Sequence, residues 1–210
     1  MQHFFHDRAR DQGKRVRTRC LLIDSAISVV GERGVLNTTI QELTREAGLS
    51  NGTFYNHFED REQLIREAAT SIGLVLAEDI AQQVSHIEEG LGRIVVSTQM
   101  FITLASAQPA WAKVLCEAAN NVFEMRLDMA RGMLSDIELA IGQGAPLEMP
   151  DRFKLFQIGT LIALALEARI SGQDDESITR ATCDAQLRLL GMTPEQARRK
   201  VATYLSQQEH

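Results

Sequence analysis

Residues 38–64 read TTIQELTREAGLSNGTFYNHFEDREQL, and this stretch decides the fold. Thr39 and Glu42 have the spacing of a capping box, in which each side chain accepts from the backbone N–H of the other residue. Gly48 ends that helix, because glycine reaches the left-handed conformation without steric cost. Ser50 caps the short helix that follows. Two short helices joined by a glycine-containing turn predict a helix-turn-helix.

The second short helix, over about residues 51–57, is polar for a helix of a protein core. Its clearly apolar residues are Phe54 and, just beyond it, Phe58, and a spacing of four turns both toward one side. The other side chains carry hydroxyls, amides and an imidazole, which suit base edges and phosphates in a major groove. Gly52 lets the backbone approach a phosphate, and the helix N-terminus favours the same anion. The alternative is a solvated helix face in any small helical domain.

As an ordered string, this stretch resembles the helix-turn-helix of the TetR family of bacterial transcriptional regulators. The resemblance runs from Thr39 through Ala47-Gly48-Leu49-Ser50, the Gly52-Thr53-Phe54-Tyr55 run and Asn56-His57-Phe58 to Arg61 and Leu64. With the preceding helix it covers about 50 residues, roughly a quarter of the chain. It implies an all-α dimeric regulator with an N-terminal DNA-binding domain and an effector pocket among the later helices.

Three positions depart from the family pattern. Asn51 stands where the family often has a basic residue, Thr44 where it has a small apolar residue, and Arg61 where it has lysine. Arg61 keeps the positive charge for a phosphate contact, whereas Asn51 does not. The predicted DNA-binding residues are Thr39, Ser50, Asn51, Gly52, Thr53, Tyr55, Asn56, His57 and Arg61.

The charge distribution fits a DNA partner although the formal net charge is −6. Residues 1–20 hold six Lys or Arg and two Asp, whereas residues 62–210 hold 13 basic and 20 acidic residues. The basic surplus therefore lies just ahead of the helix-turn-helix, where phosphates would be. Residues 1–13 are polar and predict a flexible arm, which either follows phosphates and a minor groove or is a solvated tail.

The composition predicts an all-α chain. Hydrophobic content is 44%, charged content is 24%, prolines number four, and strand-like alternation is scarce. Residues 14–60 form the three-helix DNA-binding domain, beginning with a helix over about 15–32. After a cap at Asp60, apolar residues recur every three or four positions to about residue 89, which predicts a rod of about 40 Å.

Residues 61–210 are expected to form a helical bundle, which brings the total to about nine or ten helices. Further helices are predicted at about 91–107, 109–120, 122–141, 151–170, 176–190 and from 193 onward. The last one begins with Thr193, Pro194 and Gln196, a capping box with proline at the first helical position.

A cluster of large, adaptable apolar side chains at 100–129 is typical of a small-molecule cavity. An ordinary packed core is the alternative from the residues alone, and the family resemblance favours the cavity. The predicted ligand-binding residues are Met100, Phe101, Thr103, Leu104, Trp111, Leu115, Asn120 and Phe123.

The helix over about 151–170 is apolar around nearly its whole circumference, so it needs cover on every side. A second copy of the chain is the economical cover, and the resemblance implies a homodimer through this helix and the one at 176–190. The alternative is a central core helix within one chain.

Other functional classes lack their signatures. The sequence contains no glycine-rich phosphate loop, no Gly-x-Ser-x-Gly, no His-Glu-x-x-His and no Cys-x-x-Cys. We therefore expect no enzyme, no cofactor and no metal site. Three dispersed cysteines, no apolar run longer than six residues and no apolar N-terminal segment predict a cytoplasmic protein without a membrane span.

These observations together predict a TetR-type transcriptional regulator, a repressor released from its operator by a small apolar or amphipathic effector. The alternatives are a helix-turn-helix DNA-binding protein without an effector and a helical enzyme. The sequence does not identify the effector, the operator or the regulated genes. Nor does it separate a repressor from an activator.

Overall fold

The computed structural model describes residues 3–121, 123–173 and 175–206. Within these ranges the chain is helical, with twelve α-helices, one 3-10 turn and no strand. In chain order they are α1 (Phe4–Arg8), α2 (Lys14–Arg33), the 3-10 turn η1 (Val35–Asn37), α3 (Ile40–Glu46), α4 (Asn51–Tyr55), α5 (Arg61–Val84), α6 (Gly90–Ala107), α7 (Pro109–Asn121), α8 (Phe123–Arg131), α9 (Leu134–Gly142), α10 (Arg152–Ile170), α11 (Asp175–Leu189) and α12 (Pro194–Ser206).

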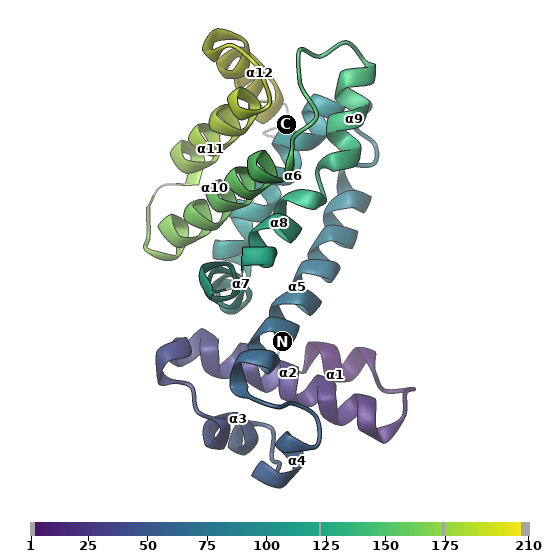
Figure 1. Ribbon diagram of the computed structural model, residues 1–210, viewed down its shortest axis with the longest axis vertical. Helices are drawn as coiled ribbons and strands as arrows, with labels where there is room; N and C mark the ends of the chain where they lie inside the picture. Colours follow the sequence, from purple (N-terminus) through teal and green to yellow (C-terminus); the bar gives the residue numbers. More distant parts are fainter. Residues whose placement is uncertain (1–2, 122, 174, 207–210) are drawn as a thin grey trace.

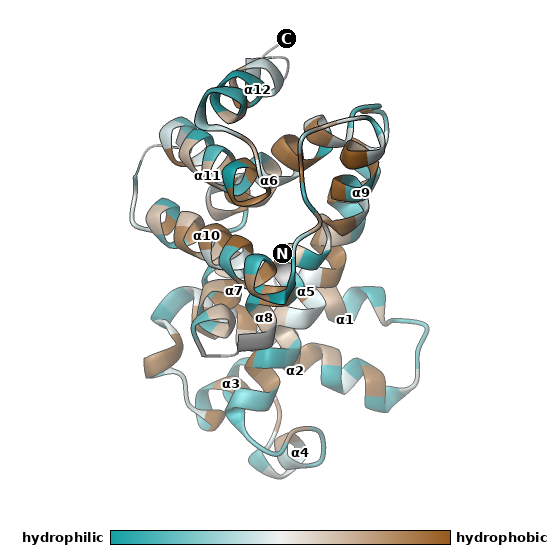
Figure 2. Cartoon of the chain, turned by 45° about the horizontal axis from the view of Figure 1, so that its top comes forward, coloured by the Kyte–Doolittle hydropathy of each residue, from teal (hydrophilic) through white to brown (hydrophobic). Residues whose placement is uncertain are grey.

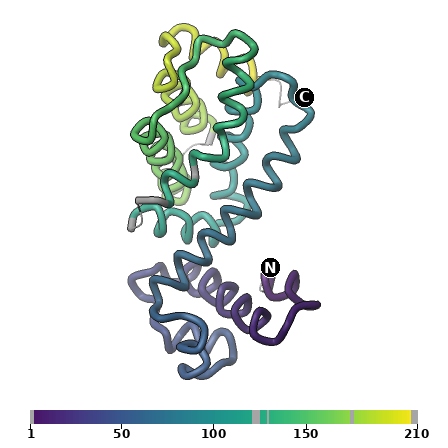
Figure 3. The backbone as a smooth tube through the Cα atoms, turned by 45° about the vertical axis from the view of Figure 1, so that its right-hand side comes forward, coloured from purple at the N-terminus to yellow at the C-terminus, as the bar shows by residue number. Residues whose placement is uncertain are grey.

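The helices are arranged in two groups along the long axis of the molecule. Helices α1 to α4 lie at the lower end of Figure 1, and α6 to α12 form the upper bundle. Helix α5 runs diagonally from the lower group into the bundle, as the tube in Figure 3 shows. Its 24 residues correspond to about 36 Å at the usual rise. One rigid element therefore joins the helix-turn-helix to the bundle.

The hydrophobic core consists of two clusters, and the first crosses the predicted domain boundary at residues 60 and 61. It contains Phe54 and Phe58 of the helix-turn-helix, Leu64 and Ile72 of α5, and Leu115 of α7. The second cluster unites α6 with α9 to α12. Because the helix-turn-helix shares its core with α5 and α7, a shift of these helices is transmitted to it through packed side chains.

Twelve helices replace the nine or ten expected. Residues predicted as a single helix over 122–141 form α8 and α9, which are separated at Gly132 and Met133. Their side chains are apolar on both sides of this break, so periodicity alone did not locate it. The other additional helix is α1.

The N-terminal segment differs from the flexible arm expected for residues 1–13. Helix α1 is packed against α2, and the carboxylate of Asp24 accepts from the backbone N–H of Phe5 at 3.0 Å and of His6 at 2.8 Å. The ring centroids of Phe4 and Phe5 lie 5.3 and 6.0 Å from that of Trp111 on α7. Two aromatic anchors and a buried helix cap hold α1 on the protein, so it is not an arm free to follow a DNA groove.

Candidate nucleic-acid interface and cavity

Two side-chain caps define helix α3 and the turn after it. Thr39 Oγ1 accepts from the Glu42 backbone N–H at 3.2 Å, and a Glu42 carboxylate oxygen accepts from the Thr39 N–H at 3.0 Å. Gly48 has a φ of 65°, the left-handed conformation that favours glycine. The backbone N–H of Leu49 then returns to the carbonyl of Thr44 at 2.8 Å. The predicted capping box and glycine stop are confirmed.

Helix α4 separates apolar from polar side chains as predicted. Ser50 Oγ accepts from the Thr53 backbone N–H at 3.1 Å. Phe54 and Phe58 are 0% and 2% exposed, whereas Tyr55 is 60% exposed. Asn51, Gly52 and Asn56 are exposed as well. Helix α4 is at the far end of the molecule in Figure 1, and α3 and α4 carry hydrophilic stretches in Figure 2. These residues therefore form one outward polar face, available to a groove.

Two of the three departures from the family pattern contact each other. The hydroxyl of Thr44 on α3 lies 2.8 Å from Oδ1 of Asn51 on α4. The hydrogen bond joins the two helices of the motif across the turn, where a small apolar residue would leave Asn51 without this partner. Asn51 therefore helps to set the angle between α3 and α4 as well as standing at the outward face.

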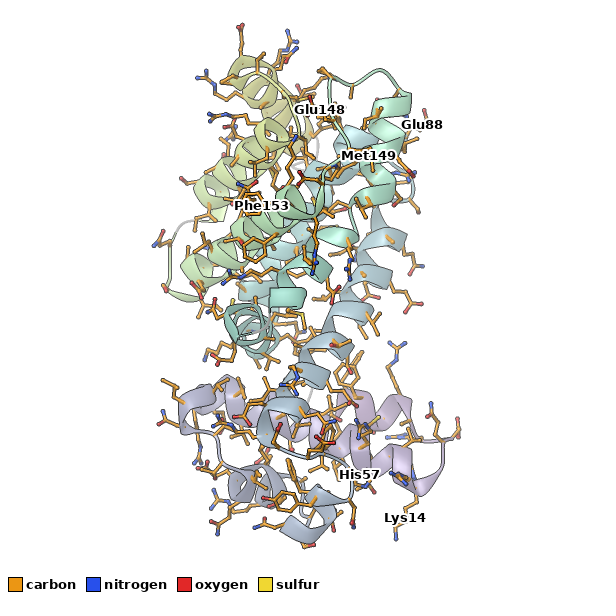
Figure 4. The ribbon with its side chains drawn as sticks, viewed as in Figure 1. Lys14, His57, Glu88, Glu148, Met149 and Phe153 are labelled. Atoms are coloured by element: carbon orange, nitrogen blue, oxygen red, sulfur yellow. The ribbon has the colours of Figure 1, made fainter. Side chains whose placement is uncertain are left out.

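His57 lies at the edge of the polar face and is half-buried. Its pKa is lowered by burial and by the positive charges of Arg15 and Arg19, so the ring is neutral at pH 7. Within the described ranges its Nδ1 is buried without a hydrogen-bond partner. Figure 4 labels His57 and Lys14 at this end of the molecule. The basic start of α2 is thus close to the end of α4.

The cations of this region have two different roles. Arg19 pairs with Glu67 of α5, donates to the carbonyl of His57 and lies 4.1 Å from the ring centroid of Phe58. Lys14, Arg15 and Arg17 are exposed. Arg19 therefore holds α2 against α5, and the three exposed cations are the ones available to phosphates.

Arg61, predicted to contact a phosphate, makes contacts within the chain. Its guanidinium donates to the carbonyls of Thr38 at 2.8 Å and Val35 at 3.3 Å, and it pairs with Glu62 at 2.7 Å. These bonds tie the start of α5 to the turn before α3. No local sequence pattern predicts these contacts, because the carbonyls lie 23 and 26 residues away along the chain.

Arg61→Ala is expected to lower the free energy of unfolding by about 1–3 kcal/mol, because two carbonyls lose a charged donor. Urea unfolding monitored by circular dichroism measures this change. Arg61→Lys is the matched control, since it keeps the charge but not the planar fork that reaches both carbonyls. Unchanged stability of Arg61→Ala, together with a weaker salt dependence of DNA binding, would instead make Arg61 a phosphate ligand.

A cavity of about 510 Å³ lies between α5 and the bundle. Its lining comes from α5 to α10, and its residues are Ala69, Thr70, Gly73, Leu74, Ala77, Ile80, Ala81, Val84, Arg93, Ser97, Thr98, Phe101, Leu115, Met125, Asp128, Gly132, Met133, Ser135, Asp136 and Ile162. The volume is within the range of about 300–1,000 Å³ that is usual for small-molecule sites.

Only Phe101 and Leu115 of the predicted ligand-binding residues line this cavity. Trp111 packs against α1 instead. Thr103 is exposed and donates to the carbonyl of Gln99, and Asn120 is exposed and donates to Glu167 at 2.6 Å. Met100 and Leu104 are not among the lining residues. The side chain of Phe123 lies outside the described parts of the structure.

The sequence contains one local signal for the α5 wall of this cavity. Ala69, Gly73, Ala77 and Ala81 recur every four residues along one face of α5. A Cβ at Gly73 would meet no atom within 4 Å. The small residues on this face of α5 leave room for the cavity. The larger side chains on the opposite wall come from helices up to about 90 residues away in sequence, and no local sequence pattern reveals that they face α5.

The outer surface of α10 carries exposed apolar side chains. Phe153 and Leu164 are 66% and 55% exposed, and Figure 4 labels Phe153 near the start of α10. Phe153 belongs to a groove between α10 and α11, which is lined by Phe153, Phe156, Gln157, Thr160, Leu161, Ala185, Arg188, Leu189, Met192 and Pro194. The inner face of the same helix buries Ile158, Ile162 and Leu166. Apolar residues on both sides of α10 explain its unbroken hydrophobic pattern.

Other chemistry has no cluster to support it in the described ranges. These ranges contain no group of three His, Cys, Asp or Glu residues that could hold a metal ion. Burial raises the pKa of the Cys116 and Cys183 thiols to about 12, so both are protonated. No helix in the described ranges is long and apolar enough to cross a membrane.

Comparison with known sequences supports this arrangement of motifs. The sequence profile of one family, described as bacterial regulatory proteins of the tetR family, matches residues 22–68, which include the whole helix-turn-helix. An uncharacterized HTH-type transcriptional regulator of Haemophilus influenzae is 33% identical over 89 residues, which are 42% of this chain and 43% of that relative. The chain thus spans less than half the length of this curated relative.

Solved structures share the fold over most of the chain. RolR in complex with resorcinol has a TM-score of 0.74 at 24% identity, and the match covers 90% of this chain and 95% of that one. FadR from Bacillus subtilis in complex with stearoyl-CoA has a TM-score of 0.59 at 15% identity, covering 80% of this chain and 96% of that one. These likenesses establish the same order and packing of helices.

Proposed function

We propose that this chain, whose residues 22–68 match the tetR family of bacterial regulatory proteins, is a TetR-type transcriptional repressor that a small effector releases from operator DNA. The observation that carries the proposal is the division of helix α4. Phe54 and Phe58 anchor this short helix in the core, and Tyr55 and Asn56 face outward between two side-chain caps. A helix fixed in this way presents its polar face to a major groove without reordering.

The proposed contacts divide by chemistry. Tyr55, Asn56, Thr53 and the amide of Asn51 are suited to base edges and nearby phosphates, because they offer donors and acceptors on an exposed face. Ser50 and Thr39 hold helix N-termini, and Gly52 leaves the backbone accessible to a phosphate. The exposed cations Lys14, Arg15 and Arg17 supply charge. Neutral His57 lies at the edge of this surface and adds no charge to it.

We propose a homodimer through α10 and α11. Exposed Phe153 and Leu164 and the neighbouring groove supply the apolar surface that a two-fold, self-complementary interface requires. Two α4 helices in such a dimer would enter successive major grooves if they lay about 34–36 Å apart. A protein with this role acts in the cytoplasm.

The cavity supports regulation by an effector. Six helices contribute to its wall, and α5, which begins directly after the helix-turn-helix, contributes eight residues. RolR and FadR, which share the fold, were each solved with a small or amphipathic molecule bound. A ligand that favours one position of α5 would change the spacing of the two α4 helices, with a coupling of about 1–3 kcal/mol.

The test is binding of the purified protein to its own upstream DNA by fluorescence anisotropy. Tyr55→Ala is expected to weaken specific binding by about 5–150-fold, the usual worth of a base contact, and to leave the melting temperature unchanged because the ring is exposed. Thr103→Ala, an exposed position on α6, is the control and should bind like wild type. If Tyr55→Ala binds operator and random DNA as wild type does, α4 is not the recognition helix.

A further inference from the structure

Asp136 stands out among the residues that line the cavity. It lies in the first turn of α9, is 9% exposed, and lines the cavity. Burial raises the pKa of its carboxyl, and the charge of Arg93 partly opposes that shift. A buried carboxylate normally receives at least one hydrogen bond, since desolvation is costly without it. Asp136 therefore requires a donor.

The protein does not supply that donor from the residues the structure describes. The nearest cation, Arg93 Nη1, is 3.7 Å from a carboxylate oxygen of Asp136, too far for a hydrogen bond. Arg93 is held back because its Nε donates to the carbonyl of Ile87 at 2.7 Å and Nη2 to that of Ser85 at 3.2 Å. The two opposite charges thus face each other across a gap on the wall of the cavity.

A hydroxyl group suits this gap. Its O–H donates to the carboxylate of Asp136, and its oxygen accepts from Nη1 of Arg93. A cationic group would stand beside Arg93, and an anionic group would stand beside Asp136, with like-charge repulsion in either case. The surrounding wall is apolar, with Val84, Phe101 and Met133 among its members. The occupant must therefore be neutral, apolar over most of its surface, and hydroxylated at one end.

We propose that the cavity binds a neutral hydroxylated molecule, a phenol or an alcohol with an apolar body, whose hydroxyl lies between Asp136 and Arg93. This proposal rests on the effector function proposed above and gives its ligand class. The hydroxyl bridges α9 to the residues that follow α5, because Arg93 is itself tied to the loop at 85–87. Ligand binding thereby links α9 to the C-terminal end of α5, and the N-terminal end of α5 packs against the helix-turn-helix.

Calorimetric titration with three probes that share one apolar body tests the proposal: 4-butylphenol, butylbenzene and 4-butylbenzoate. Wild type is expected to bind 4-butylphenol about 10-fold or more tightly than either other probe, the usual worth of a hydrogen bond to a charged group. Asp136→Asn should reduce this preference several-fold and leave butylbenzene binding unchanged. Asp79→Asn is the matched control, because Asp79 is exposed on α5 and is not among the residues that line the cavity.

Three outcomes would overturn the proposed ligand class: equal binding of the phenol and butylbenzene, tighter binding of the benzoate, or no binding of any probe to folded protein. The same wild-type samples are then measured for operator affinity at saturating 4-butylphenol. If wild type prefers the phenol, Asp136→Asn does not, and 4-butylphenol leaves the operator affinity of wild type unchanged, the binding site is upheld and the effector role is refuted. The opposite result is that 4-butylphenol lowers the operator affinity of both wild type and Asp136→Asn, while neither protein prefers the phenol over butylbenzene. That result would uphold an effector role and refute this ligand class.

Discussion

Leu164→Arg is expected to convert the protein to monomers and to lower its affinity for operator DNA by about 10²–10⁴-fold, the usual contribution of linked binding at two half-sites. Leu164 is 55% exposed on α10, so arginine has room in the single chain and should not unfold it. In a two-fold interface through α10, both copies would bury the positive charge of the introduced arginine among apolar side chains, which is costly for an unpaired charge.

Sedimentation velocity measures the change in mass, and fluorescence anisotropy measures the loss of DNA affinity. Leu74→Arg is the matched control, because Leu74 is 69% exposed on α5, away from the proposed interface. It should remain dimeric. A wild-type protein that sediments as a folded monomer at micromolar concentration, or a Leu164→Arg variant that stays dimeric, would exclude α10 as the interface.

Gly159→Ala is expected to destabilise the protein by about 3 kcal/mol or more, at the upper end of overpacking effects. A Cβ at Gly159 would lie 1.8 Å from the carbonyl oxygen of Arg126 and 2.6 Å from its carbonyl carbon. These are backbone atoms of α8, so no side-chain rotation relieves the clash. Helices α8 and α10 must move apart, and the core around Ile158 must open with them.

Urea unfolding compares this variant with Gly73→Ala, which is the same substitution in the interior of another helix. A Cβ at Gly73 meets nothing within 4 Å, so alanine there should raise stability by about 0.5–1 kcal/mol through helix propensity. Opposite signs for the two variants would establish that close helix contact, and not propensity, requires glycine at 159. Equal midpoints would contradict the packing described for α8 and α10.

The features that the sequence determined are those with partners a few residues away. Thr39 with Glu42, Ser50 with Thr53, and Thr193 with Gln196 all form the expected caps, because their atoms meet within a single helical turn. The spacing of Phe54 and Phe58 likewise fixed which side of α4 is buried. Such local geometry suffices to identify the helix-turn-helix and the all-α class without any knowledge of the rest of the chain.

The tertiary structure decided what depends on distant partners. Whether a large side chain lines the cavity or fills the core is set by the helix opposite it, so Phe101 and Leu115 line the cavity while Trp111 packs against α1. The sequence predicts a phosphate contact for Arg61, and only the tertiary structure shows that its guanidinium donates to the carbonyls of Val35 and Thr38. Asp136 and Arg93 are 43 residues apart and have no shared pattern. Their juxtaposition exists only because the helices pack side by side, and no periodicity in one segment records which distant segment it will face.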